Sequence, residues 1–266
     1  MMGNLIDLIH RDGSFRVIGV GGGAFVSQDL VLDARERPRP GLVERVLLAG
    51  MTSDPQVLSH RQIERANPAE GVSLAVLFHH WVDGLSEEIE LEVRRHLMVG
   101  FLRDVKGYNL MEVIVEGRQC ELKWALAGGF RVRSDYESWY AEHRDPQPRR
   151  VLFGMARHEA ADSVGSVVSL VFDYTPPKLG FTTSQRRLLS QAIQYKTDAE
   201  IASALSVSVS AVKKTWAAIF DKVTDVIPQN GDDVRDVTTP GPATRGAQKR
   251  HRLLTYLHDH PEEIKP

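Results

Sequence analysis

Two short motifs that start helices constrain this chain more than any other feature. Thr182 is followed three residues later by Gln185, and Thr197 is followed three residues later by Glu200. In such a capping box the hydroxyl accepts a hydrogen bond from the third amide of the helix, and the longer side chain reaches back to the amide of the capping residue. We therefore expect one helix to begin near residue 183 and another near residue 198.

Apolar spacing extends these starts into helices and predicts a third one. Ser206-Val207 separates the second helix from the third, and Ser208 can cap the third. The inward-facing residues are Leu188, Leu189, Ala192 and Ile193 in the first helix, Ile201, Ala202 and Leu205 in the second, and Val212, Trp216, Ile219, Phe220 and Val223 in the third.

Three short helices with a tight turn before the last one are typical of the helix-turn-helix, whose last helix enters the major groove by its N-terminal residues. With Val212 and Trp216 inward, the outward face carries Ser210, Lys213, Lys214 and Ala217. Residues 181–226 hold six Lys and Arg against four Asp and Glu. The two lysines suit phosphates and guanine edges, and Ser208 and Ser210 would position the helix end.

The segment also carries a family pattern, spread over Phe181-Thr182, Leu188-Leu189, Asp198-Ala199-Glu200-Ile201-Ala202, Leu205, Ser208, Val212-Lys213, Ile219 and Lys222-Val223. These residues resemble the C-terminal DNA-binding domain of LuxR-type (NarL- or GerE-like) transcriptional regulators, over about 50 of the 266 residues. The resemblance implies a four-helix module that binds double-stranded DNA as a homodimer through its third helix. It implies contacts from Ser208, Lys213, Lys214 and, by position only, Ala217.

The chain departs from that pattern at several positions. Tyr195 stands where the family usually has Gly, Ala211 where it has Thr, and Thr215 where it has His. Ala217 stands where relatives often place a cation, so affinity would depend more on Lys213 and Lys214. The fourth helix, which forms the dimer surface in the family, is expected to be short because Pro228 closely follows residues 225–227.

Prolines divide the chain into segments. Pro176-Pro177 should end a strand at residues 167–172, and a polar stretch rich in Pro and Gly from residue 228 to 242 predicts a linker. We predict an α+β sensor or dimerisation domain over 1–175, a helix-turn-helix domain over 176–228, and a linker with a C-terminal helix over 229–266. By family analogy the first domain has a GAF- or PAS-like shape.

Within the first domain, β-branched runs predict strands at Phe15–Val20 and Met111–Val115, with more strands in 119–133 and 150–172. Apolar residues at every fourth position predict a helix over 86–105, and 135–142 is expected to be a short helix. A stripe of Leu253, Leu254 and Leu257 predicts a helix near the C-terminus that docks on the body or on a partner. Its cations Lys249, Arg250 and Arg252 are further candidates for DNA contact.

Composition limits the cellular compartments and binding modes that we expect for this chain, but it does not identify a partner. The net charge is -2, so nucleic-acid binding requires a local basic surface. The single Cys120 excludes an internal disulfide and a thiolate zinc cluster, which fits a reducing cytoplasm. No secretory signal or run of about 18 apolar residues is present, so we expect a soluble cytoplasmic protein without membrane contact.

Four other motifs favour structural roles. Gly19–Ala24 predicts a strained loop or hairpin rather than a dinucleotide site, because no helix pattern follows it. His79-His80-Trp81-Val82-Asp83-Gly84 is one residue short of a condensation-enzyme signature and predicts core packing or a ligand pocket. Cys120 is expected to be buried beside Trp124, and His251, His258 and His260 lie on a helix surface. We therefore predict no catalytic residue, metal site or cofactor.

The sequence thus predicts a transcriptional regulator that binds DNA and responds to a small-molecule effector through its first domain. One alternative is an α/β enzyme that uses a nucleotide or small molecule and whose C-terminal helices mediate assembly. Another is a module that binds a protein instead of DNA.

Overall fold

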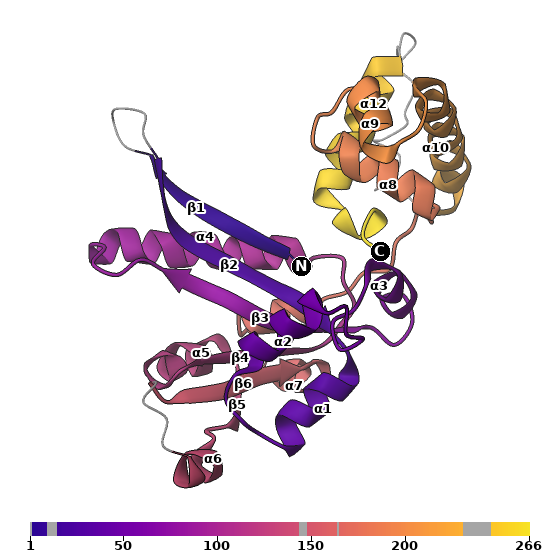
Figure 1. The fold of residues 1–266 in the computed structure, drawn as a ribbon. Helices are drawn as coiled ribbons and strands as arrows, with labels where there is room; N and C mark the ends of the chain where they lie inside the picture. The colour runs from indigo at the N-terminus through magenta and orange to yellow at the C-terminus, as the bar shows by residue number, and fades with distance from the viewer. Residues whose placement is uncertain (1, 10–14, 144–147, 164, 231–245) are drawn as a thin grey trace. The chain divides into compact units, whose positions relative to one another are not determined.

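The computed structural model describes residues 2–9, 15–143, 148–163, 165–230 and 246–266. The chain divides into two compact units, Met1–Tyr174 (unit 1) and Thr175–Pro266 (unit 2), shown in Figure 1. The division falls before Thr175, which precedes Pro176 and Pro177; these prolines lack the amide hydrogen that would continue a sheet or helix.

Unit 1 is built on one mixed sheet, which confirms the predicted α+β class. Its strands are β1 (Met2–Ile9), β2 (Phe15–Val26), β3 (Val72–Trp81), β4 (Leu110–Arg118), β5 (Arg131–Ser134) and β6 (Arg150–Ala156). They lie in the order β1-β2-β3-β4-β6-β5, and every neighbouring pair is antiparallel except β3 and β4. A parallel pair needs a long crossover, which here includes a 19-residue helix.

The helices of unit 1 are α1 (Gln28–Glu36), α2 (Leu42–Met51), α3 (His60–Ala66), α4 (Glu87–Val105), α5 (Leu122–Gly128), α6 (Glu137–Glu142) and α7 (Arg157–Asp162), with 3-10 helices η1 (Gln119–Glu121) and η2 (Val168–Phe172). The predicted helix over 86–105 is confirmed as α4. Ser86 caps it by accepting from the Ile89 amide.

Helices cover both faces of the sheet. Leu74 and Ala75 are adjacent on β3 and point to opposite faces, yet both are fully buried. Ala75 packs in one cluster with residues of α1 and α2, whereas Leu74 packs in another with residues of α4, α7 and η2. This two-sided burial explains why the central strands are almost continuously apolar.

Of the strained loop or hairpin expected at Gly19–Ala24, the loop is wrong, because these residues continue strand β2, which pairs antiparallel with the preceding strand β1. The pairing with β3 is irregular between Gly22 and Gly23. A Cβ on Gly23 would lie 2.8 Å from the carbonyl oxygen of Ala75, so the close approach of β3 requires glycine there. The prediction failed because glycines carry no strand signal of their own. Helix α1 also follows, where no helix was expected.

Two further strand predictions are wrong in part. Residues 168–172 of the run at 167–172 form the 3-10 helix η2. Most of 119–133 forms η1 and α5, and only β5 is extended there. Short apolar runs do not distinguish a buried strand from a buried helical turn. The strand expected within 150–172 is confirmed as β6, and the short helix expected within 135–142 is confirmed as α6.

A buried ion cluster joins β5 to α7. The carboxylate of Glu159 is 9% exposed and accepts from both terminal nitrogens of Arg133, one at 2.8 Å. It also accepts from the backbone amide of Ala156 at 2.8 Å. The hydrogen bond from Arg133 lowers the pKa of Glu159 to about 2, although burial alone would raise it.

This cluster predicts how unit 1 responds to acid. Because the pKa of Glu159 is lower in the folded chain than the ordinary 4.5, its stabilisation is complete above about pH 4.5 and is lost as the pH falls toward 2. We expect the free energy of unfolding, measured with urea at several pH values, to fall more steeply below about pH 4.5 in the wild type than in E159Q. The control E137Q alters a carboxylate that is 72% exposed and should follow the wild type. Identical slopes for E159Q and the wild type would contradict the assignment.

Unit 2 is helical. It contains α8 (Thr183–Ala192), α9 (Asp198–Leu205), α10 (Val209–Asn230), α12 (Gly246–Asp259) and the 3-10 helix η3 (Pro261–Glu263). Both predicted capping boxes are present, at Thr182 and Gln185 and at Thr197 and Glu200. The first two predicted helices are therefore confirmed.

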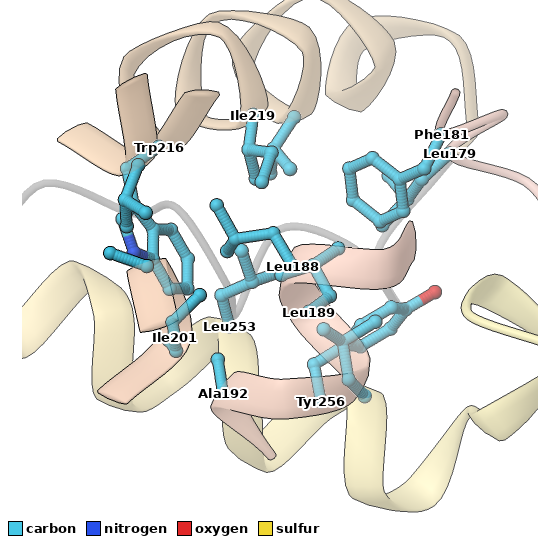
Figure 2. Close-up of a cluster of buried hydrophobic side chains, with 14 residues drawn as sticks. Leu179, Phe181, Leu188, Leu189, Ala192, Ile201, Trp216, Ile219, Leu253 and Tyr256 are labelled. Carbon is cyan, nitrogen blue, oxygen red and sulfur yellow. The ribbon is translucent and has the colours of Figure 1, made fainter. Parts of the chain in front are cut away.

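The α-helices described in unit 2 share one apolar core (Figure 2). Side chains from α8, α9, α10 and α12 converge there with two residues that precede α8. The core includes Leu179, Phe181, Leu188, Leu189, Ala192, Ile201, Ala202, Val212, Trp216, Ile219, Val223, Leu253, Tyr256 and Leu257.

The end of α10 differs from the prediction. This helix continues to Asn230 and includes Pro228, so residues 225–227 belong to it and not to a separate short helix. No glycine lies between Lys222 and Pro228 to end the helix, and a proline in the last turn removes only one helical donor. The rest of the predicted linker, from 231 to 242, lies outside the described residues. The predicted C-terminal helix is confirmed as α12, and it packs inside the core.

The C-terminal residues are also fixed to the start of unit 2. Glu263 is 1% exposed, and its carboxylate accepts from the amides of Lys178 and Leu179 at 2.8 and 2.9 Å. The hydroxyl of Tyr256 lies 3.4 Å from the same carboxylate. Unit 2 thus closes on itself, with residues near its start and its end in contact.

Candidate nucleic-acid interface

The turn between α9 and α10 is short and hydrogen-bonded. Ser206 ends α9 in the left-handed conformation, with φ 55°. The amide of Val207 then donates to the carbonyl of Ala202 at 2.9 Å. Ser208 accepts from the amide of Ala211 at 3.1 Å and so caps α10. The predicted turn and cap are confirmed, and they fix the direction in which α10 leaves the turn.

The buried face of α10 is the predicted one. Val212, Trp216, Ile219 and Val223 are each at most 6% exposed. Trp216 stacks on the ring of Phe220 with 5.5 Å between centroids. Trp216 is therefore a core residue, as expected, and this packing determines which side of α10 faces outward.

The five predicted contact residues lie on the outward side. Ser208, Ser210, Lys213, Lys214 and Ala217 are all exposed. At about 100° per residue, Ser210, Lys214 and Ala217 fall opposite Val212, and Lys213 flanks them. The first three turns of α10 thus present two ammonium groups and a hydroxyl on one convex surface.

Sequence reasoning missed two apolar residues beside this surface. Val207 and Val209 are 46% and 40% exposed, on either side of the capping Ser208. Apolar side chains at such a position can contact the methyl group of thymine. Their signal in the sequence is weak: they are apolar residues outside the spacing that predicts the buried face.

The cationic surface ends after Ala217. Asp221 and Asp225 are exposed, and at about 100° per residue they lie on the same side of α10 as Lys214. Carboxylates there would repel phosphates, which restricts a nucleic-acid contact to the leading half of the helix.

Tyr195 stands where the resembled family has glycine, and its backbone conformation shows why glycine suits this position. Its backbone is left-handed, with φ 60°, and its side chain is 83% exposed. Glycine adopts this conformation at little cost, whereas another residue loses about 1 kcal/mol. The position therefore favours the glycine that the family pattern has.

One of the C-terminal cations, Arg250, contacts residues of α9 and α10 and does not lie on the outward surface of α10. Arg250 on α12 donates to the carboxylate of Asp198 at 2.7 Å and to the carbonyl of Lys196 at 3.1 Å. Its guanidinium also lies 4.5 Å from the centroid of the Trp216 ring. Arg250 thus links the first turn of α9 to the buried face of α10. Of the other two candidate cations, Lys249 is exposed and Arg252 is half-buried.

Charge is distributed unequally between the units. Residues 1–174 hold 20 Lys and Arg against 25 Asp and Glu, whereas residues 175–266 hold 13 against 10. The positive balance lies in unit 2, which contains α9 and α10. A polyanion would therefore be attracted to unit 2 and repelled by unit 1.

Most polar side chains of the remaining motifs are exposed, namely His79, His80, Cys120, His251 and His258. His79 and His80 lie at the exposed end of β3. The expectation that Cys120 is buried is wrong, because it lies exposed in η1, where the chain turns away from the sheet. His251 and His258 are exposed on α12, and no group of three metal-ligating side chains occurs in the described ranges.

Comparisons with known proteins returned no match. No protein-family model, no curated protein and no solved structure matches the chain. In the part of the chain that the structure describes, no helix is both long enough and apolar enough to cross a membrane.

Proposed function

We propose that the chain is a cytoplasmic transcriptional regulator that binds double-stranded DNA through the leading turns of α10. One observation carries the proposal: the turn after α9 and the apolar core leave Ser208, Ser210, Lys213, Lys214 and Ala217 together on an exposed helix surface. The lysines would neutralise phosphates or reach guanine edges, and the serines would position the helix end. The resemblance to LuxR-type regulators adds a homodimer and a sensing role for unit 1.

The proposal is tested by replacing both lysines. We expect K213A/K214A to bind DNA fragments from the neighbouring promoter region at least about tenfold more weakly. We also expect the slope of log affinity against log salt to become shallower by about 2, because each lysine releases about one counterion. Fluorescence anisotropy across a series of salt concentrations measures both quantities.

The matched control removes two exposed lysines of unit 1, Lys106 and Lys123. K106A/K123A changes the net charge equally and should leave the slope unchanged. A slope in K213A/K214A equal to that of the wild type would reject the assigned surface. Absence of DNA binding by the full chain at low salt would reject the regulator and favour an enzyme or a protein-binding module.

A further inference from the structure

The centre of the sheet in unit 1 opens at one end. The parallel strands β3 and β4 pair from Val72 to Val76 and from Leu110 to Val115. Beyond these residues β3 pairs with β2 alone, and β4 pairs with β6 alone. Because the two strands are parallel, both run toward the same end of the sheet. The carboxyl ends of β3 and β4 therefore lie at the same end of the sheet without pairing to each other there.

A cavity of about 210 Å³ lies at this end. Trp81 at the end of β3, Arg94 on α4 and Trp124 on α5 line it together. These residues come from three elements that meet where the strands separate. Trp124 is 60% exposed.

The guanidinium group of Arg94 contacts both indole rings. The guanidinium carbon of Arg94 lies 4.7 Å from the centroid of the Trp81 ring and 4.6 Å from that of Trp124. Tryptophan is the strongest cation-π partner among the side chains, and two faces around one cation add to this attraction. The geometry therefore selects flat or weakly hydrated cations.

The charged side chains around the cavity also favour a positively charged ligand. The lining of the cavity includes three carboxylates, those of Asp83, Glu90 and Glu121, against the guanidinium groups of Arg94 and Arg118. Glu90 pairs with Arg94, and Glu121 pairs with Arg118 at 2.8 Å. One negative charge is left in excess, so an anion would meet net repulsion and a cation net attraction.

We propose that this cavity binds a small organic cation, with a guanidinium or methylated ammonium group, against the indoles of Trp81 and Trp124. The side chain of Arg94 competes for the same ring faces. The cation is the effector of unit 1 only if the function proposed above holds, but its binding does not depend on DNA binding, because every residue involved lies in unit 1.

The test is calorimetric titration of the full chain with agmatine and with choline, and with acetate and phosphate as anion comparators. We expect the cations to bind and the anions not to bind. W124A should bind the cations at least about fivefold more weakly. R94A should bind them at least about fivefold more tightly, because it removes both the competing group and a repelling charge.

The control is L126A, which truncates a side chain that is 49% exposed on the same short helix and does not line the cavity. It should bind as the wild type does, and circular dichroism checks that every variant is folded. Weaker cation binding by R94A, binding of the anions instead, or no cation binding by either the wild type or R94A would overturn the proposal. Loss of DNA binding in K213A/K214A would leave these titrations unchanged, so the two proposals fail separately.

Discussion

Replacing Leu253 and Leu257 together by Ala will lower the free energy of unfolding of unit 2 by about 4–10 kcal/mol. Both side chains lie in the shared core, at 1% and 0% exposure. Each buried Leu→Ala change costs about 2–5 kcal/mol, whereas a whole domain is stable by about 5–15 kcal/mol. Two such cavities in one core therefore remove most of its stability. The loss of helix is measured by far-ultraviolet circular dichroism during thermal and urea unfolding.

The matched control truncates two residues on the outer side of the same helix. His251 and His258 are exposed on α12, so H251A/H258A should unfold at nearly the same temperature as the wild type. If the two leucine changes left the helix content and the unfolding midpoint unaltered, α12 would not belong to the core of unit 2.

The DNA experiments require the full chain for the same reason. Arg250 connects α12 to Asp198 at the start of α9 and to the ring of Trp216 in α10. A chain that ends near residue 228 would lack this link together with two core leucines. Such a fragment would lose DNA binding through unfolding, so it could not test the lysines.

The sequence predicted the start of each of the first three helices in unit 2 because those signals are local. Thr182, Thr197 and Ser208 each act within four residues of the chain, and each forms the predicted cap. The place of α12 could not be predicted in the same way. A stripe of leucines indicates that a helix needs a partner, but it does not identify the surface that it covers.

The candidate surface on α10 was predictable because it follows from the buried face. Once Val212 and Trp216 are buried, helical geometry alone turns Lys214 outward. The length of α10 was not predictable from that rule, because a proline in the last turn of a helix is tolerated. The exposure of Val207 and Val209 was also missed, since apolar residues are expected inside.

In unit 1 the sequence-based predictions that failed concern features that depend on contacts between separate elements of the fold. Gly23 lies in a strand because β3 approaches its backbone closely, and no local preference for a strand is involved. The cavity at the open end of the sheet was beyond prediction, because Trp81, Arg94 and Trp124 come from separate elements. The segment around His79 was expected to form core or a pocket, and its Trp81 lines that cavity.

The carboxylate of Glu116 on β4 has several partners in unit 1, and its side chain is fully buried. It accepts from the amides of Gly41 and Leu42 at the start of α2, at 3.0 and 3.1 Å. It also accepts from the hydroxyl of Tyr136 at 2.8 Å and from Arg150 at 2.9 Å. Because Gly41 has no side chain to cap α2, Glu116 performs that role from a strand.

We expect E116A to lower the free energy of unfolding of unit 1 by about 3–5 kcal/mol, since it leaves a guanidinium and buried donors without their acceptor. The control E44A removes the other carboxylate that pairs with Arg150, at 2.9 Å, but this one is 60% exposed. Exposed pairs contribute only about 0–1 kcal/mol, so E44A should change little. Urea unfolding at neutral pH measures both. Equal losses in E116A and E44A would mean that the pairing with Arg150 alone accounts for the effect, whereas a much larger loss in E116A assigns it to the buried donors of α2 and Tyr136.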